Sequence, residues 1–382
     1  MQLSELHPKL AQVTDQFCLI RSMSHPRPIN NHFDAMHNLL SGQIVERVRE
    51  GVADDLPYIG SVVAKHLSSD RNLLTNAWLI KCVGAPVFCA PNIGSGGYLG
   101  SSYAPVFIGS ADNHPAMPKF KLPEIYDMGD KARLQERRKL LANLESDRLA
   151  EEPIGKDWHE LRELAYDSMT RPEGRAAFNL QEEPLSVRER YGMHPLGQNL
   201  LLARRMVEAG VRFVTVNGWV GPAPGENGGG PPSSSWDMHG GNMGMGNAFS
   251  TGSYGMGFCL PRLDEALSAL LTDLKDRGML DDTLVVAVGE FGRTPVILTQ
   301  GPPGRQHWPQ CFSAIIAGCG IRGGAVYGES DKTGAAPKSN PVTPQDLHAT
   351  VLHALGVPLN DLGKNTGIIR PPYSSGKPVM AL

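Results

Sequence analysis

Asp237 and His239 could contribute to a metal site. They lie two residues apart, so in an extended segment their side chains point the same way. A carboxylate oxygen and an imidazole nitrogen that face one point can bind a divalent metal. The alternative is a hydrogen-bonded Asp–His pair that orders its own loop, and the sequence leaves both interpretations open.

Glu290 and Arg293 form a second candidate pair. Glu290 follows an apolar run at 284–288, which predicts a strand buried on both faces. Ligands of open α/β sheets collect at the carboxyl ends of strands, so Glu290 is expected to be a metal ligand or a general base. Arg293 is a permanent cation suited to a sulfate or phosphate oxygen. The alternative is a structural Glu–Arg ion pair at a turn.

His307 and Arg305 lie in a third segment, residues 301–309, which precedes another predicted strand. Prolines and Trp308 flank them and restrict the backbone. We expect this segment to reach the same sheet edge as Glu290, with His307 as a ligand. A purely structural histidine is the alternative.

Asn31 and His32 begin a predicted helix at 33–40, which ends at Gly42. A helix N-terminus stabilises negative charge and therefore suits an anion or a nucleophile. Asn is also a common capping residue, so a capping role is equally compatible with the sequence.

The elements that must position these side chains follow an α/β pattern. A predicted helix at 196–209 leads through Gly210 into a strand at 211–216, and a helix at 260–276 leads into the strand at 284–288. We expect one domain, 1–382, with a mostly parallel sheet and helices on both faces.

Two further segments stand out by composition. A charged, helical stretch at 130–182 is expected to be an insertion or cap. A Gly-rich stretch at 221–257 contains Trp236, Asp237 and His239, which solvated linkers rarely carry together. We interpret it as an ordered loop over a site.

Charge and hydropathy exclude several classes of protein. The 382 residues carry a formal net charge of -3 with no basic cluster, which argues against a nucleic-acid partner. No apolar run reaches the roughly 20 residues of a membrane span. Residues 1–10 lack the features of a signal peptide. The six cysteines form no Cys-x-x-Cys pair and are expected to be small core residues.

These motifs, in this order, resemble the domain-of-unknown-function 1501 family, which is grouped with sulfatases and alkaline phosphatases. The resemblance rests on Trp236-Asp237-Met238-His239, on the segments 289–295 and 304–308, and on 20–23 and 191–214. It covers essentially the whole chain.

The resemblance implies an alkaline-phosphatase-like or sulfatase-like fold and a divalent metal, with zinc, calcium and manganese as the candidates. Asp237, His239, Glu290 and His307 would be metal ligands or their neighbours. The segment 32–42 is similar to the sulfatase helix that begins with the nucleophile. The substrate would be a small-molecule or saccharide ester.

The sequence also departs from that pattern. The sulfatase Cys-x-Pro-Ser-Arg motif is absent, and Asn31 and His32 stand at the matching start, which argues against a formylglycine nucleophile. Family members normally begin with an export signal, then a strand and an early metal carboxylate, and this chain begins after that point. We therefore expect a fragment or a misassigned start, a sheet without one central strand and a site without one ligand. Export to the periplasm or cell surface is implied by the family alone.

The leading hypothesis is a metal-dependent hydrolase of sulfate or phosphate esters, with Arg293 and Arg305 neutralising the transferring group. A non-catalytic metal- or ligand-binding protein that keeps the fold is the first alternative. A phosphomutase or isomerase on the same fold is the second.

Overall fold

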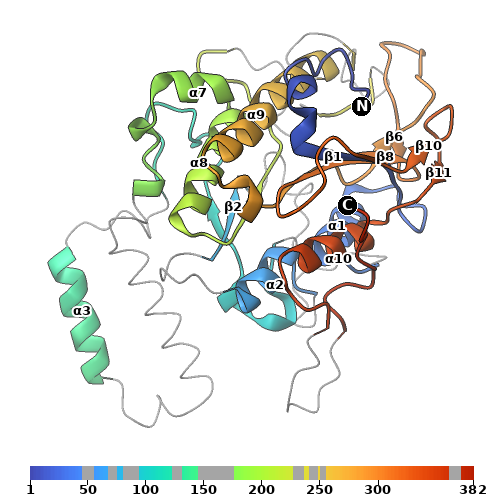
Figure 1. Cartoon of the computed structure of the whole chain (residues 1–382). Coiled ribbons are helices and arrows are strands. Elements are labelled where there is room, and N and C mark those ends of the chain that lie inside the picture. Colours follow the sequence, from blue (N-terminus) through green and yellow to red (C-terminus); the bar gives the residue numbers. More distant parts are fainter. Residues whose placement is uncertain are drawn as a thin grey trace.

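Two sheets form the centre of the molecule (Figure 1). A computed structural model describes residues 1–44, 56–67, 75–80, 94–122, 131–144, 176–226, 236–240, 248–249, 255–360 and 371–382. The first sheet has the strand order β5-β8-β1-β9, and the second has the order β3-β2-β4. Their bounds are β1 Phe17–Met23, β2 Asn76–Leu79, β3 Val106–Ile108, β4 Phe213–Val216, β5 Val285–Val288, β8 Phe312–Ala317 and β9 Val326–Tyr327.

The two sheets differ in strand direction. In the three-stranded sheet β2 runs parallel to both β3 and β4. In the four-stranded sheet β8 is antiparallel to β1 and β5, whereas β1 and β9 are parallel. The expected α/β class with a parallel sheet is confirmed, and β8 is the strand that introduces the antiparallel pairs.

Helices cover both faces of the sheets (Figure 1). On one side lie α7, α8 and α9, and on the other lie α1, α2 and α10. Their bounds are α1 His32–Ser41, α2 Ile59–His66, α7 Leu185–Tyr191, α8 Pro195–Ala209, α9 Met256–Asp276 and α10 Pro344–Ala354. Short two- and three-residue strands and 3-10 helices complete the fold: β6 Gly292–Arg293, β7 His307–Trp308, β10 Glu329–Ser330, β11 Pro337–Ser339, and 3-10 turns at Leu10–Gln16, Gly97–Leu99, Ser101–Tyr103, Leu180–Glu182 and Leu280–Asp282.

Local sequence sets where these helices begin and end. Helix α10 starts with a capping box between Thr343 and Asp346 and has a proline in its first turn. The Nδ1 atom of His194 accepts a hydrogen bond from the N–H of Gly197 and so caps α8. Helix α8 ends at Gly210, whose φ of 113° is accessible to glycine at little cost.

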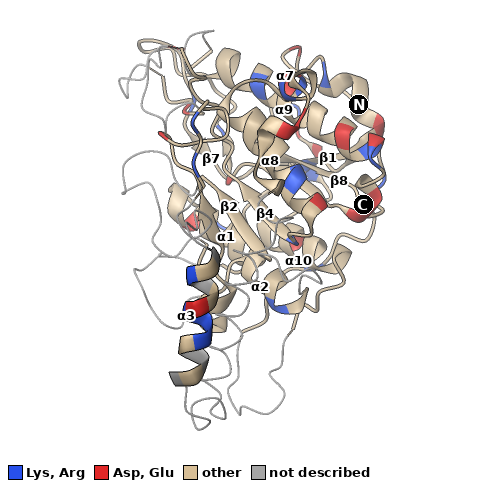
Figure 2. Cartoon of the chain, turned by 90° about the vertical axis from the view of Figure 1, so that its left-hand side faces the viewer, with Lys and Arg blue, Asp and Glu red and all other residues tan. Residues whose placement is uncertain are grey.

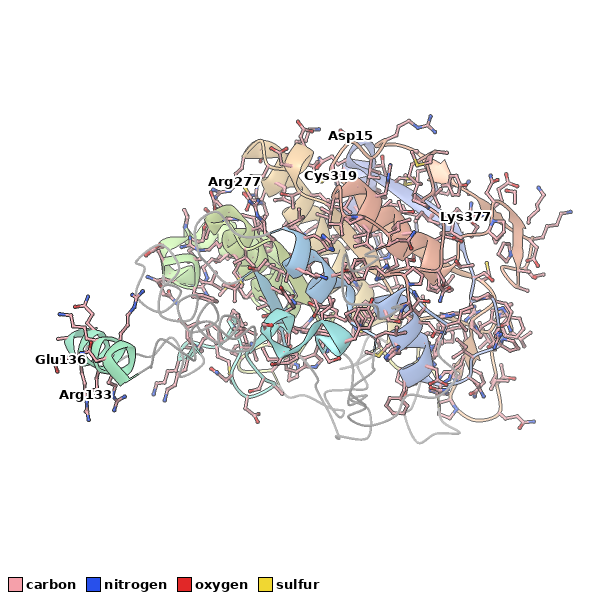
Figure 3. The ribbon with its side chains drawn as sticks, turned by 90° about the horizontal axis from the view of Figure 1, so that it is seen from below. Asp15, Arg133, Glu136, Arg277, Cys319 and Lys377 are labelled. Atoms are coloured by element: carbon pink, nitrogen blue, oxygen red, sulfur yellow. The ribbon has the colours of Figure 1, made fainter. Side chains whose placement is uncertain are left out.

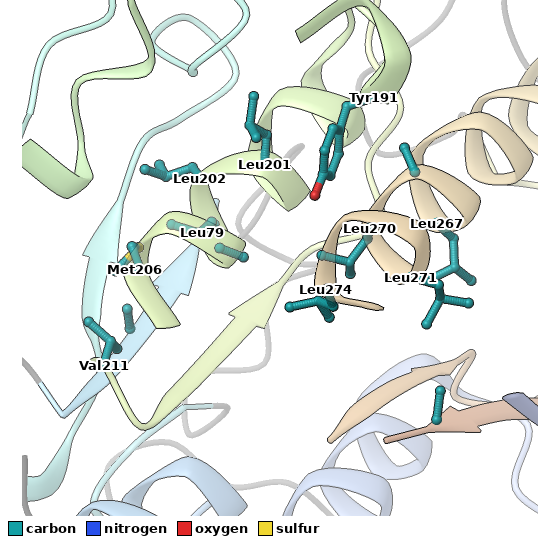
Figure 4. Close-up of a cluster of buried hydrophobic side chains, with 14 of the residues drawn as sticks. Leu79, Tyr191, Leu201, Leu202, Met206, Val211, Leu267, Leu270, Leu271 and Leu274 are labelled. Carbon is teal, nitrogen blue, oxygen red and sulfur yellow. The ribbon is translucent and has the colours of Figure 1, made fainter. Parts of the chain in front are cut away.

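The main apolar core lies between α8, α9 and the sheets (Figure 4). Leu201, Leu202 and Met206 of α8 and Leu271 of α9 are fully buried there. These side chains recur at helical spacing, so each helix turns one apolar stripe to the sheet.

A buried ionic cluster ties α8 to α9. The Arg204 side chain is fully buried and lies 2.7 Å from a Glu183 oxygen, 3.0 Å from an Asp273 oxygen and 2.6 Å from a Glu208 oxygen. The Tyr191 hydroxyl donates to Asp273 at 2.9 Å. Because an unpaired buried charge is costly, each member of this cluster depends on the others.

Helix α3, Lys131–Leu144, stands apart from the rest of the chain (Figures 1 and 2). Arg133 and Glu136 are exposed on it (Figure 3), and residues 145–175 of the expected insertion at 130–182 lie outside the described residues. Residues 86–91, where the sequence favours a short strand, and residues 156–170, where it favours a helix, also lie outside them. Within the described part of the chain, no helix is long and apolar enough to span a bilayer.

One expectation about burial is wrong. The strand Val285–Val288 is half-buried rather than buried throughout, because it lies at the edge of its sheet and one of its sides borders a cavity. The prediction assumed a neighbouring strand on each side, as in an interior parallel strand.

Candidate functional site

The candidate residues meet where β5 ends. Glu290 lies two residues beyond the end of this strand, and Phe291 then leads into the two-stranded ribbon of β6 and β7. In that ribbon Arg293 lies directly opposite His307, which brings the third predicted segment beside the second. The sequence-based expectation that 301–309 reaches the Glu290 edge therefore describes the observed arrangement.

The loop that carries Asp237 and His239 rests against the same ribbon. The backbone N–H of Arg305 donates to the carbonyl oxygen of Met238. A Cβ atom on Gly304 would lie only 2.4 Å from backbone atoms of His239 and Gly240, so the two chains touch backbone to backbone. Glycine is required at such a close approach.

Helix α1 supplies His32. Its Nδ1 atom lies 2.6 Å from the Glu290 carboxylate, and its ring packs 4.9 Å from the Phe291 ring. Glu290 thus pairs with a histidine 258 residues away in sequence. From the sequence, Glu290 was expected to be a metal ligand or a general base, or alternatively the ion-pair partner of Arg293.

Asp237 is bonded to its own loop neighbour. Its Oδ1 atom lies 2.5 Å from Nδ1 of His239 and accepts the His239 backbone N–H at 2.9 Å. This is the hydrogen-bonded Asp–His pair that the spacing allowed as the alternative to two metal ligands. Arg293 Nη1 lies 4.0 Å from the same carboxylate oxygen and 3.5 Å from His239 Nδ1.

His307 lies between the other two histidines. Its ring centroid is 4.5 Å from that of His32, 4.7 Å from that of His239 and 4.5 Å from that of Phe291. Its Nδ1 atom lies 3.2 Å from the carbonyl oxygen of Asn30. Its Nε2 atom is buried and has no hydrogen-bond partner among the described residues.

The three imidazoles share one hydrogen-bonding pattern. Carboxylates and carbonyls can only accept from a neutral ring, so Nδ1 of each ring is the protonated nitrogen. The Nε2 atoms of His32, His239 and His307 then carry the free lone pairs. Histidines that bind metals are commonly oriented in this way, with the second nitrogen donating to a carboxylate or carbonyl.

Charge and burial adjust the pKa values of the site. Burial lowers the pKa of His307 to about 4, with a small opposing effect from the Asn30 carbonyl, so this ring is neutral near pH 7. Burial would raise the pKa of Glu290, but the His32 hydrogen bond and Arg293 outweigh it and leave that pKa below its usual value. Near pH 7 the His307 ring is therefore neutral and the Glu290 carboxylate is ionised.

The two arginines differ in their contacts. Arg293 is half-buried beside Asp237 and His239, where its guanidinium is a fixed positive charge. Arg305 donates through Nη1 to the carbonyl oxygens of Thr294 and Pro295 and so braces the ribbon. We therefore assign the anion-binding proposal to Arg293 and a bracing role to Arg305.

Asn31 caps α1. Its side chain accepts the Asp34 backbone N–H and donates to the Asp34 carboxylate, both at 2.8 Å. His25 is a further residue of the site that sequence reasoning did not assign a role. It is buried, and its Nε2 atom lies 2.6 Å from the Glu290 carbonyl oxygen, which fixes the turn that presents the Glu290 carboxylate. A histidine followed by Pro26 was the available signal.

The donor types fit a divalent metal, although the described residues do not assemble a complete set. Imidazole nitrogens suit zinc and carboxylate oxygens suit calcium or manganese. Within the described ranges no three His, Cys, Asp or Glu side chains are grouped closely enough to hold one ion.

The comparisons with known proteins identify the family. The sequence pattern of the family described as "Protein of unknown function (DUF1501)" matches residues 1–368. The chain therefore belongs to this family. No curated protein matches the sequence significantly.

Several solved structures are similar in fold at low sequence identity. A phosphonate monoester hydrolase from Silicibacter pomeroyi is 14% identical, with 98% of this chain and 73% of that chain covered and a TM-score of 0.38. The lipoteichoic acid synthase LtaP from Listeria monocytogenes is 11% identical, with 97% and 69% covered and a TM-score of 0.40. A protein in the alkaline phosphatase superfamily from Vibrio parahaemolyticus is 10% identical, with 92% and 61% covered and a TM-score of 0.38.

Proposed function

We propose that this chain carries the site of a metal-dependent hydrolase of sulfate or phosphate esters. The observation that supports it is the meeting of three imidazoles, each held through Nδ1, at the carboxyl end of β5. Ligand sites of α/β proteins are typically found at that end of the sheet. The substrate would be a small-molecule or saccharide ester, and export to the periplasm or cell surface belongs to the same proposal.

The Nε2 atoms of His32, His239 and His307 are the nitrogen donors that this site would offer a metal, with Asp237 and Glu290 orienting two of these rings, although among the described residues these groups are not gathered around one point. A bound divalent ion would supply a Lewis acid that polarises the ester oxygen and lowers the pKa of water. This assignment places the two carboxylates behind the imidazoles, as positioning residues.

Arg293 would hold the negatively charged ester. Its guanidinium lies within 4.0 Å of the Asp237 carboxylate and within 3.5 Å of His239. A fixed cation in a half-buried site stabilises charge on sulfate or phosphate oxygens more strongly than it could in water. Its own pKa is lowered by burial, against which the two neighbouring carboxylates act, and arginine remains charged throughout the working pH range.

Metal analysis and turnover test the proposal together. Elemental mass spectrometry on purified protein should find about one or two equivalents of zinc, manganese or calcium, and His307→Ala should reduce that content. His353→Ala removes an exposed histidine on α10 and controls for adventitious surface binding. Turnover is then measured with a nitrophenyl sulfate, a nitrophenyl phosphate monoester and a nitrophenyl phosphate diester as substrates, in the presence of each candidate metal in turn.

A result of equal metal content in the parent, His307→Ala and His353→Ala would contradict the assignment of the site. Metal that is lost only in His307→Ala, without turnover of any of the three esters, would favour the alternative of a non-catalytic metal-binding protein. One observation already favours that alternative, because Asn31, at the position expected for a nucleophile, is engaged in capping α1.

A further inference from the structure

The two described sheets face each other at β4 and β5. β4 is the last strand of one sheet and β5 the first strand of the other. Among the described residues no strand is hydrogen-bonded to the outer side of either one. Backbone N–H and C=O groups on such an edge need partners, and buried ones nearly always have them.

The space between these edges belongs to a cavity of about 1910 Å³, which also extends to the candidate site at Asp237, His239 and His307. It is lined by both strands, by α9 residues such as Leu267 and Leu270, and by α10 residues such as Leu347 and Val351. Ordinary ligand pockets measure roughly 300–1,000 Å³. A mostly apolar space of this size inside a core is unfavourable unless something fills it.

The same helices cover both strands. One apolar cluster contains Val214 of β4, Val285 and Ala287 of β5, and Leu267 of α9. A second cluster, on the opposite face, contains Phe213 and Val286 together with α10 side chains. The two sheets are therefore parts of one layer between two layers of helices, with a gap in its middle.

Both strands point toward the candidate site. After β4 the carbonyl oxygen of Gly218 accepts the indole N–H of Trp236, beside Asp237. After β5 comes Glu290. The carboxyl ends of β4 and β5 thus meet at the same place, and the two strands are oriented alike.

We propose that this gap is a docking site for one extended peptide strand, apolar on both faces, that hydrogen-bonds to β4 and β5 at once. Each edge strand has four residues, so an occupant of roughly five residues would span them at about 3.3 Å per residue. Side chains on its two faces would enter the two apolar clusters, which sets the chemistry: Val- and Ile-rich, without charge or proline. Strand addition of this kind draws affinity from the main chain and specificity from alternate side chains.

A synthetic peptide tests the proposal on the intact chain. The probe is a five-residue Val/Ile segment flanked by lysines and carrying a fluorophore. The control has the same sequence with alternate backbone nitrogens methylated, which removes donors but keeps the apolar side chains. Anisotropy should show saturable binding of the probe and at least about tenfold weaker binding of the control, since each lost backbone bond is worth roughly 1 kcal/mol.

Hydrogen exchange locates the bound probe. Amides of both β4 and β5 should exchange more slowly with the probe than without it. Ala287→Glu, which places a charge against the gap, should abolish binding, while Val326→Glu on β9 at the other edge of the same sheet should leave it unchanged.

Three outcomes would overturn the inference. Equal binding of the methylated control would show a merely apolar cavity. Slower hydrogen exchange in only one of β4 and β5 would show that the peptide pairs with one edge and is not inserted between the two strands. Slow exchange in both strands before any peptide is added would show that the chain already fills the gap with its own residues.

Discussion

Replacing Gly304 by alanine should displace the Asp237–His239 loop from the site while leaving the fold intact. The new Cβ would lie 2.4 Å from backbone atoms of His239 and Gly240, whereas ordinary contact begins at 3.4 Å. The two segments must therefore separate by about 1 Å. Gly304 does not lie in the left-handed region of φ, so the substitution causes a collision rather than local backbone strain.

The separation has a predictable cost. It would break the hydrogen bond from Arg305 N–H to the Met238 carbonyl, which at about 1 kcal/mol is a small part of the total stability. The site should suffer far more, because a displacement of about 1 Å can lower activity roughly 10²-fold. We expect metal affinity, and ester turnover if present, to fall by about that factor.

The assay combines hydrogen exchange at residues 236–240 with titration of zinc or manganese by calorimetry. Faster exchange in that segment should accompany the weaker binding, with an unchanged midpoint of unfolding to within a few degrees. Gly301→Ala is the matched control in the same ribbon loop. Its Cβ would meet nothing within 4 Å, although its φ of 84° makes the substitution mildly strained. If Gly304→Ala exchanged and bound metal as the parent does, the backbone contact would not hold the loop.

Three further predictions follow from burial and charge. Burial lowers the pKa of His194 and His348 to about 3, so below about pH 6.5 the unfolded chain binds more protons than the folded one. The free energy of unfolding should therefore fall as the pH decreases from about 6.5 to 3, by up to about 1.4 kcal/mol per pH unit for each histidine. Urea titrations that show equal stability at pH 7 and pH 5 would contradict this prediction. Arg204→Met removes the fully buried cation that Glu183 and Asp273 share, although Arg205 and Arg277 still contact these carboxylates. It should destabilise the protein by about 1–3 kcal/mol in denaturant unfolding, whereas Arg133→Met on α3 should change stability by less than about 0.5 kcal/mol. Glu290→Gln removes the charged acceptor of one imidazole and should weaken metal binding by about 10–100-fold with little change in thermal stability; an unchanged affinity would rule out its positioning role.

The elements of the fold were largely predictable from local patterns. The strand predicted after residues 301–309 is β8, Phe312–Ala317, and α8 and α9 begin within a few residues of their expected starts at 196 and 260. Periodicity and the glycine at 210 are local signals, so no tertiary information was needed. The antiparallel direction of β8 and the unpaired edge of β5 depend on pairing between distant segments, which a local pattern does not encode.

The site residues were predictable by type, but their partners were not. Spacing placed Asp237 and His239 together and could not decide between two ligands and a hydrogen-bonded pair, which is what the loop forms. The contact between His32 and Glu290 joins positions 258 residues apart. The Gly-rich composition of residues 221–257 predicted an ordered loop over a site. Only the fold shows that the backbone of this loop at His239 and Gly240 contacts Gly304.

The anchoring of the three imidazoles has a consequence for biosynthesis. His32 is made early, but the carboxylate that orients it lies at position 290 and the third ring at position 307, about four fifths of the way along the 382 residues. Of the three rings only His239 is anchored by a near neighbour in sequence, Asp237, so His32 and His307 gain their partners only when distant segments fold together. In the proposed metal site, tight metal capture would therefore be coupled to folding of the chain.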